Sequence, residues 1–391
     1  MIALLLILTL QAPADSLTLE RALQRARAER GSVAAAGAGV AEARAALRTS
    51  SELPNPTVSY SHSESVPRHH LVVDQPLNWL LRRGTDRAAA RAGIARAEAD
   101  SSLSVAGLLR DVRIAFYRAR ASRLAEALAH GQATLADSVA GIAAARLRAG
   151  DISLLEREQA TQEAARARQA SALAREAARI DEAELARAIA WDAGPLPPLA
   201  GPLDGGLDRM PDTTIDLSVL PALRGALADS AAAAALARSA SLARVPLPTV
   251  QSGAEWGDES QPGTLAVIGV AIPLPLWNRG GGSVAAARAR ATGAAARARE
   301  ARLDAVRQIR QALIHLEETA SRARFARDTL VPASGLLRAR ALRAYQAGET
   351  GILPVLDALR GERDVSLAAL QDQLAFQEAL ADWYALTGRS E

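Results

Sequence analysis

The chain of 391 residues contains no cysteine and no lysine, and only 3% of its residues are aromatic. Without cysteine there can be no disulfide scaffold, zinc ribbon, catalytic thiol or lipid-bearing N-terminal cysteine. Five histidines offer few ligands for a metal enzyme. All 46 basic residues are arginine, and they are interleaved with 43 acidic residues, so no basic tail for nucleic acid exists.

The residues that are abundant point to long helices. Alanine, arginine, glutamate and leucine dominate, and 49% of the chain is hydrophobic, which is too much for a disordered protein. A chain of this length forms two or three compact domains or one extended domain.

The first 14 residues have the pattern of a signal peptide. Ile2 to Leu10 is apolar apart from Thr9, and Ala12-Pro13-Ala14 supplies an A-x-A cleavage pattern, so Asp15 would begin the mature chain. No later segment reaches ~18 uncharged apolar residues, the minimum for a transmembrane helix. We therefore expect export to the periplasm, the outer membrane or the exterior.

The chain repeats itself with a period close to half its length. Three short motifs recur in the same order, 192 to 199 residues later. They are Pro54-Asn55-Pro56-Thr57-Val58 with Pro246-Leu247-Pro248-Thr249-Val250, Pro76-Leu77-Asn78-Trp79 with Pro275-Leu276-Trp277-Asn278, and Arg148-Ala149-Gly150-Asp151 with Gln346-Ala347-Gly348-Glu349. This predicts a first repeat over 15–193, a linker rich in proline and glycine over 194–216, and a second repeat over 217–391.

Both repeats follow one plan. A helix (19–50, then 217–245) precedes a β-hairpin (57–76, then 249–275) and a long helical hairpin (84–193, then 282–388). Narrow apolar seams with steps of 3 and 4 residues predict coiled-coil-like helices at Leu109, Val112, Phe116 and Ala119, and at Val306, Ile309, Leu313 and Leu316. The expected fold is therefore mainly α with a small β part.

The four predicted strands raise the question of what they pair with. Val58, Tyr60 and His62 alternate with Thr57, Ser59 and Ser61, as in a strand with two different faces. Four strands cannot close a barrel, and open sheet edges are not tolerated in lipid. The hairpins are therefore soluble sheet edges, or several chains pool their strands, in which case three copies supply twelve.

An ordered set of motifs resembles the TolC-like family of outer-membrane efflux proteins, over about residues 16–389. The residues that carry the resemblance are Leu17 to Leu23, Leu53 to Thr57, Arg146 to Ser153, Ile272 to Gly280, and Tyr345 to Thr350 followed by Val355-Leu356-Asp357. Pro275-Leu276-Trp277-Asn278-Arg279 is most similar to the heavy-metal branch that serves RND pumps.

The resemblance implies a homotrimer with a twelve-stranded β-barrel in the outer membrane of a Gram-negative-type cell, on a periplasmic α-helical barrel. Such a protein is the passive exit duct of a tripartite pump, with no catalytic activity and no cofactor. Its partners would be a periplasmic adaptor protein and an inner-membrane pump of the RND type. The aromatic residues available for a membrane girdle are few, mainly Tyr60, Trp79, Trp256 and Trp277.

The resemblance also locates two sets of functional residues. The tips of the helical hairpins, where glycine permits the reversal, would dock the adaptor; these residues are Gly150, Gly348, Leu147, Ile152, Leu155, Ala347 and Ile352. Just beyond the tips, Asp357, Glu156 and Tyr345 would line the periplasmic aperture, where carboxylates favour cations. Tyr345 could reach an acid on a neighbouring hairpin.

Other features predict no chemistry. His62, His69 and His70 lack the spacing of a metal site, and we interpret them as residues of an outward-facing loop. Gly280-Gly281-Gly282 lacks the lysine of a phosphate loop. No nucleophile, base and oxyanion set is present, so no enzyme is expected.

Two alternatives stay open at this point. Helical periodicity alone also permits a periplasmic coiled-coil structural protein without a pore. Within the family, the duct could serve drug efflux or type I secretion in place of metal export.

Overall fold

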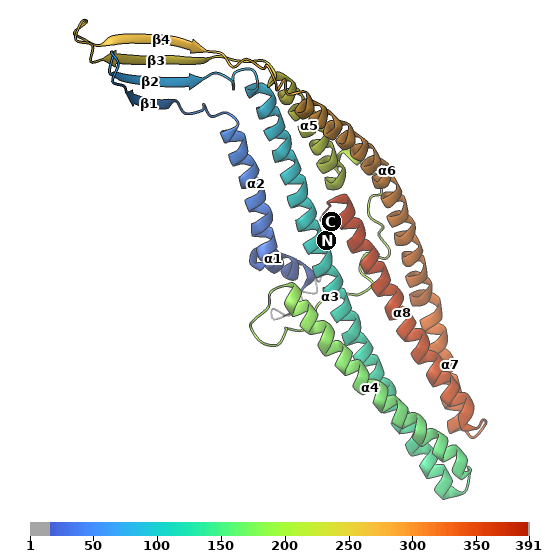
Figure 1. Ribbon diagram of the computed structural model, residues 1–391. Helices are drawn as coiled ribbons and strands as arrows, with labels where there is room; N and C mark the ends of the chain where they lie inside the picture. The colour runs from blue at the N-terminus through green and yellow to red at the C-terminus, as the bar shows by residue number, and fades with distance from the viewer. Residues whose placement is uncertain (1–15, 390–391) are drawn as a thin grey trace, which may run out of the picture. The chain divides into compact units, whose positions relative to one another are not determined.

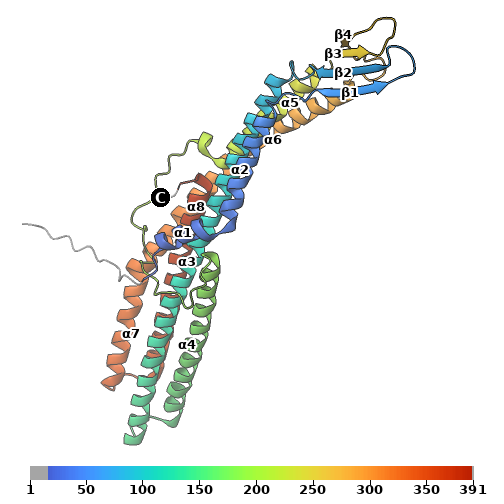
Figure 2. The ribbon, with the colours of Figure 1, turned by 90° about the vertical axis from the view of Figure 1, so that its left-hand side faces the viewer.

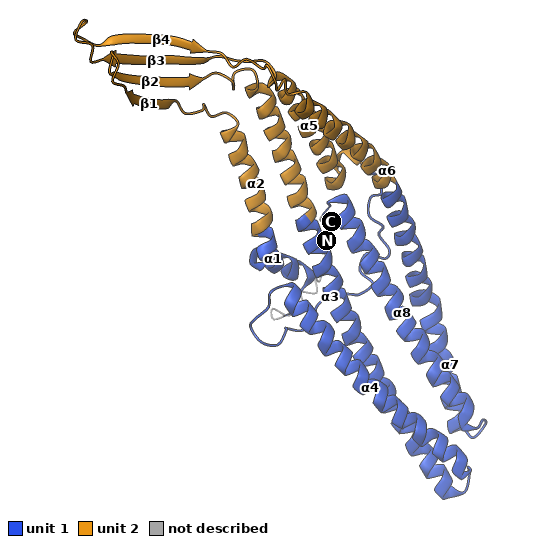
Figure 3. Cartoon of the chain, viewed as in Figure 1, with its two compact units in different colours: residues 1–33, 104–215, 307–391 blue, residues 34–103, 216–306 orange. Residues whose placement is uncertain are grey.

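The computed structural model describes residues 16–389, so the predicted signal peptide lies outside the described residues. The described chain is mainly helical and carries one four-stranded antiparallel sheet (Figure 1). It divides into two compact units, of which unit 1 comprises residues 1–33, 104–215 and 307–391 (Figure 3). Unit 2 comprises residues 34–103 and 216–306. None of the described helices is both long enough and apolar enough to cross a bilayer.

The first half of the chain contains four helices and two strands. The bounds are α1 Leu19–Glu29, α2 Gly31–Thr49, β1 Thr57–His62, β2 His69–Pro76, α3 Arg83–Ala149 and α4 Leu154–Ala188. The prediction of a single helix over 19–50 was wrong. Arg30 has an extended backbone conformation, with φ −81° and ψ 119°, and its N–H donates a hydrogen bond to the carbonyl of Ala26. Helix α1 therefore ends here, and α2 begins at Gly31.

The second half contains the remaining elements. Their bounds are η1 Leu217–Val219, α5 Pro221–Leu242, β3 Thr249–Trp256, β4 Leu265–Ala271, α6 Gly281–Phe325, η2 Ala326–Leu330, α7 Val331–Gln346 and α8 Ile352–Thr387. Here too the expected helices are interrupted. A short 3₁₀ turn precedes α5, and η2 is one π-helical turn between α6 and α7.

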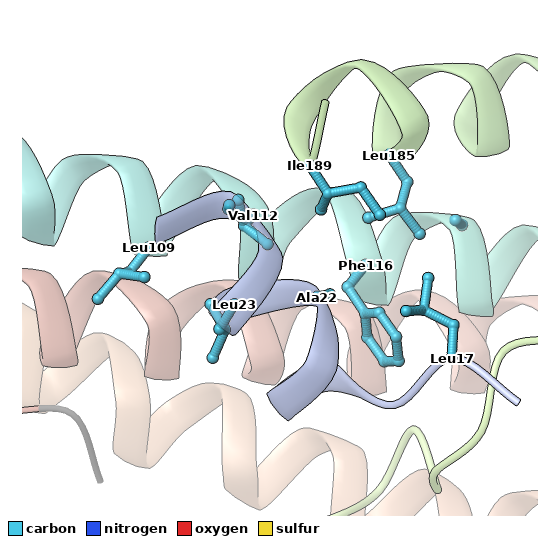
Figure 4. Packing of buried hydrophobic residues seen from close by; sticks show 10 residues of the cluster. Leu17, Ala22, Leu23, Leu109, Val112, Phe116, Leu185 and Ile189 are labelled. Carbon is cyan, nitrogen blue, oxygen red and sulfur yellow. The ribbon is translucent and has the colours of Figure 1, made fainter. Parts of the chain in front are cut away.

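In unit 1, α4 runs back along the second part of α3, as both ribbon views show (Figures 1 and 2). The predicted seam of α3 is confirmed, because Leu109, Val112, Phe116 and Ala119 are all buried. They form a core with Leu17, which precedes α1, and with Ala22 and Leu23 of α1 (Figure 4). Leu185 of α4 and Ile189, the residue after α4, complete this core. Alanine at many interior positions allows the helix backbones to approach closely.

The seam predicted for the second half is partly wrong. Leu316 is buried, whereas Val306 is exposed and the neighbouring Ala305 takes the buried position. The buried position at this point of α6 is therefore one residue earlier than predicted, at Ala305.

The segment between the halves is anchored to the helices. Leu203 and Leu207 are buried, and Leu207 packs with Phe376 and Trp383 of α8. The buried side-chain amide of Gln377 donates to the carbonyls of Leu203 at 2.9 Å and Gly205 at 2.7 Å. A proline- and glycine-rich composition signalled a linker, but the apolar residues within it hold it in the core of unit 1.

In unit 2, the sheet has the order β1-β2-β3-β4, with every pair antiparallel. The central pair joins the two halves of the chain, because β2 pairs with β3 from His69 opposite Trp256 to Pro76 opposite Thr249. The outer strands β1 and β4 each have one edge without a partner strand in the described chain.

Candidate functional site: hairpin tips and the amphipathic sheet

The two hairpin tips of unit 1 are built in the same way. Gly150 has φ +83° and Gly348 has φ +77°, a left-handed conformation that side chains with a Cβ rarely adopt. At the first tip the N–H groups of Gly150 and Asp151 donate to the carbonyls of Leu147 and Arg146. Gly348 and Glu349 donate to Tyr345 and Ala344 in the same pattern. Both helices thus end in a Schellman motif that satisfies their last carbonyls.

Glu156, predicted at the aperture, caps α4. Its carboxylate accepts from the N–H of Ser153 at 3.1 Å, and the Ser153 hydroxyl accepts from the N–H of Glu156 at 3.2 Å. This arrangement is a capping box. Its sequence signature, Ser-x-x-Glu, is present at Ser153 and Glu156, although the cap was not predicted. The same carboxylate lies against Gly351 of the second tip, where an added Cβ would meet it at 3.3 Å.

Tyr345, the third aperture residue, is fully buried. The guanidinium of Arg146 lies over its ring, 4.9 Å from the centroid, and donates to its carbonyl at 2.9 Å. Burial raises the pKa of the Tyr345 phenol, and the positive charge of Arg146 opposes that rise. Arg146 and Glu156 therefore join the two tips of one chain to each other, and sequence reasoning did not identify Arg146 in this role.

The predicted docking residues differ in exposure. Gly150, Gly348 and Ala347 are exposed, Leu155 is 65% exposed, and Leu147 and Ile152 are half-buried. Ile352 is buried in a core with Tyr345 and Val355, so its side chain contributes no surface in this chain. Two leucines that were not predicted are exposed beside the tips, Leu154 and Leu353.

Asp357 is exposed on α8, the second helix of the second hairpin, and forms no ion pair within residues 16–389. One turn further along, Arg360 binds the buried Glu163 of α4 through two hydrogen bonds of 2.6 and 2.9 Å. This interaction raises the pKa of Arg360, and the negative charge of Asp357 adds to that rise. Arg360 thus interacts with two carboxylates, Glu163 and Asp357, and the three side chains together carry one excess negative charge.

The sheet of unit 2 has two chemically different faces. On one face, Val58, Leu71, Val73 and Ile268 are apolar, and Ile268 is 84% exposed. The opposite face carries two polar pairs. Gln251 donates to Asp74 at 2.7 Å, and Nδ1 of His70 lies 3.0 Å from the Glu255 carboxylate. An exposed apolar face on a sheet with two open edges is a surface that other molecules would cover.

The described residues contain no group of three or more histidine, aspartate or glutamate side chains arranged to hold a metal ion.

Comparisons with known proteins agree with this plan. A family model described as "Outer membrane efflux protein" matches residues 217–389. The cobalt-zinc-cadmium resistance protein CzcC of Cupriavidus metallidurans is 27% identical over 357 residues, which cover 89% of this chain and 84% of CzcC.

Solved structures share the fold across nearly the whole chain. The structure of CusC matches with a TM-score of 0.79 at 17% sequence identity, and the match covers 98% of this chain and 96% of the CusC chain. The structure of VceC from Vibrio cholerae matches with a TM-score of 0.76 at 19% sequence identity, and the match covers 95% of this chain and 97% of the VceC chain. The matched family model describes efflux proteins, and CusC is described as forming a transmembrane channel. The second half of the chain therefore matches the outer membrane efflux protein family, and nearly the whole chain, with its two matched tips and four-stranded sheet, has the fold of these solved channel structures.

Proposed function

We propose that three copies of the chain form an exit duct through the outer membrane, in which a shared twelve-stranded β-barrel continues a periplasmic α-helical barrel. The observation that carries the proposal is the sheet with one apolar face, one polar face and two unpaired edges. In lipid each edge must pair, and β1 of one chain beside β4 of the next satisfies both edges. The apolar face then meets lipid and the polar face lines the lumen.

The chain in this proposal consists of two repeats, 15–193 and 217–391, with 194–216 between them. Each repeat supplies one β-hairpin and one helical hairpin, so a trimer has six of each. A periplasmic coiled-coil rod without a pore would have no use for the exposed apolar face of the sheet, which favours the duct.

The tips would dock a periplasmic adaptor protein, through which the duct joins an inner-membrane pump of the RND type. Support comes from the exposed apolar side chains beside both turns, Leu155, Leu154 and Leu353, since monomeric surfaces seldom gather such residues without a partner. CzcC is a metal resistance protein by name. We extend that to this chain and propose divalent heavy-metal cations as the cargo, with drug efflux and type I secretion as the alternatives.

The proposal is tested by the mass of the protein extracted from outer membranes in detergent, measured by light scattering. We expect a trimer, which is three times 40.9 kDa less the signal peptide, and no protein in the soluble fraction. A monomer or dimer that needs no detergent would overturn the duct and leave the structural rod.

Asp357→Asn should weaken the preference of the reconstituted channel for cations. The reason is that Asp357 is exposed past the second tip, where it, Glu163 and Arg360 carry one excess negative charge, and a threefold ring of such charges attracts cations. The measurement is the reversal potential across a planar bilayer with a salt gradient. Glu349→Gln, at an exposed acid within the tip turn, is the matched control for loss of one charge. Unchanged selectivity in Asp357→Asn would remove this residue from the aperture.

A further inference from the structure

Two histidines that are seven residues apart in sequence face each other across the first β-hairpin. His62 is the last residue of β1, His69 is the first of β2, and they form a directly opposed cross-strand pair. Their Nδ1 atoms lie 3.4 Å apart and their ring centroids 4.8 Å apart. Both side chains are on the apolar face of the sheet, whereas His70 is on the polar face with Glu255.

We propose that His62 and His69 form a bidentate binding site for a divalent transition-metal ion at the loop end of this hairpin. Zinc–imidazole bonds are about 2.05 Å long, so two nitrogens at a tetrahedral angle lie roughly 3.3 Å apart. The observed separation of 3.4 Å matches that spacing without movement of the backbone. The spacing of the two histidines along the chain does not predict this site, because only the strand register brings their imidazoles together.

One of the two imidazoles is open to solvent, and a neighbouring tryptophan supplies a reporter for the ion. His62 is exposed, and the Tyr60 hydroxyl lies 2.9 Å from Nδ1 of His69, a contact that metal binding would replace. Trp256 stacks on His69 with ring centroids 5.2 Å apart and 15° between the planes. A paramagnetic ion at the histidine pair would therefore quench the fluorescence of Trp256. Water would fill the remaining coordination positions, since no third histidine or carboxylate joins the pair in the described chain.

The ligand set determines which ions bind. Neutral imidazole suits Cu²⁺, Ni²⁺ and Zn²⁺, whereas Mg²⁺ and Ca²⁺ prefer oxygen. For fixed nitrogen ligands the affinity for Cu²⁺ exceeds that for Ni²⁺ and Zn²⁺. The pair lies on the face opposite to His70 and Glu255, so the site is separate from the transport path proposed above and does not depend on it.

The test is a Cu²⁺ titration of the untagged, detergent-extracted full chain, followed by tryptophan fluorescence and electron paramagnetic resonance. We expect one ion per chain, with a spectrum from two nitrogen ligands. His62→Ala and His69→Ala should each lower the affinity roughly tenfold or more, and leave at most one nitrogen ligand. Mg²⁺ should not compete.

His70→Ala is the matched control, because it removes the neighbouring imidazole from the other face of the same strand. It should bind Cu²⁺ like the wild type. Trp256→Phe should keep the resonance spectrum but lose most of the quenching. The proposal is overturned if either of the His62 and His69 variants binds like the wild type, or if His70→Ala weakens binding as strongly as they do. Circular dichroism verifies that each variant is folded.

Discussion

Replacing Trp383 with alanine is expected to lower the free energy of unfolding by about 3–5 kcal/mol. Trp383 is fully buried in unit 1 and packs with Leu207, Leu316 and Phe376. Truncation would leave a large cavity between α8, α6 and the anchored segment, and close-packed helices fill such a space only partly. The measurement is urea unfolding followed by circular dichroism at equal protein concentration.

Two control substitutions test whether the lost free energy of unfolding comes from the cavity. The indole Nε1 of Trp383 forms no hydrogen bond within the described residues, so Trp383→Phe loses volume alone and should cost clearly less than the alanine variant. Trp277 is 94% exposed, and Trp277→Ala should change stability by no more than about 0.5 kcal/mol. Equal losses in the Trp383→Ala and Trp277→Ala variants would contradict the packing described for α8.

Replacing Leu155 with arginine is expected to abolish export while the trimer remains intact. Leu155 is 65% exposed in the first turn of α4, so its replacement removes no core contact. At the proposed docking surface, however, an arginine would be buried without a partner, and an unpaired buried charge is costly. We expect cross-linking of the adaptor to fall at least roughly tenfold, measured in cells that contain the native pump.

Leu155→Met is the matched control, since methionine keeps the volume and the apolar character of the contact. It should retain adaptor cross-linking and export. Light scattering in detergent reports whether the arginine variant is still a trimer. If the arginine variant exports like the wild type, the first tip does not dock the adaptor through Leu155.

Local sequence patterns were sufficient to predict features that depend on a single helix or turn. The steps of 3 and 4 residues from Leu109 to Ala119 predicted a buried seam, because helical periodicity alone puts those side chains on one face. Gly150 and Gly348 predicted the two reversals, because a left-handed residue is needed where a helix ends in this way. The capping role of Glu156 was also local, and its signature was present in the sequence.

Other features depend on contacts between segments far apart in the chain. Tyr345 and Ile352 are buried because the first hairpin, about 200 residues earlier, packs against them through Arg146 and Val139. The segment 194–216 is anchored because Gln377 of α8 reaches its carbonyls. No local pattern encodes such partners, since burial depends on what the rest of the chain places nearby.

The amino-acid sequence by itself thus determined the duplication of motifs, the long helices, the tip glycines and the family resemblance, because these depend on composition, periodicity and the order of short motifs. Only the tertiary structure decided which tip residues are exposed and which charge near Asp357 is neutralised. The structure also decided that His62 meets His69, since strand register sets which side chains become neighbours across a sheet.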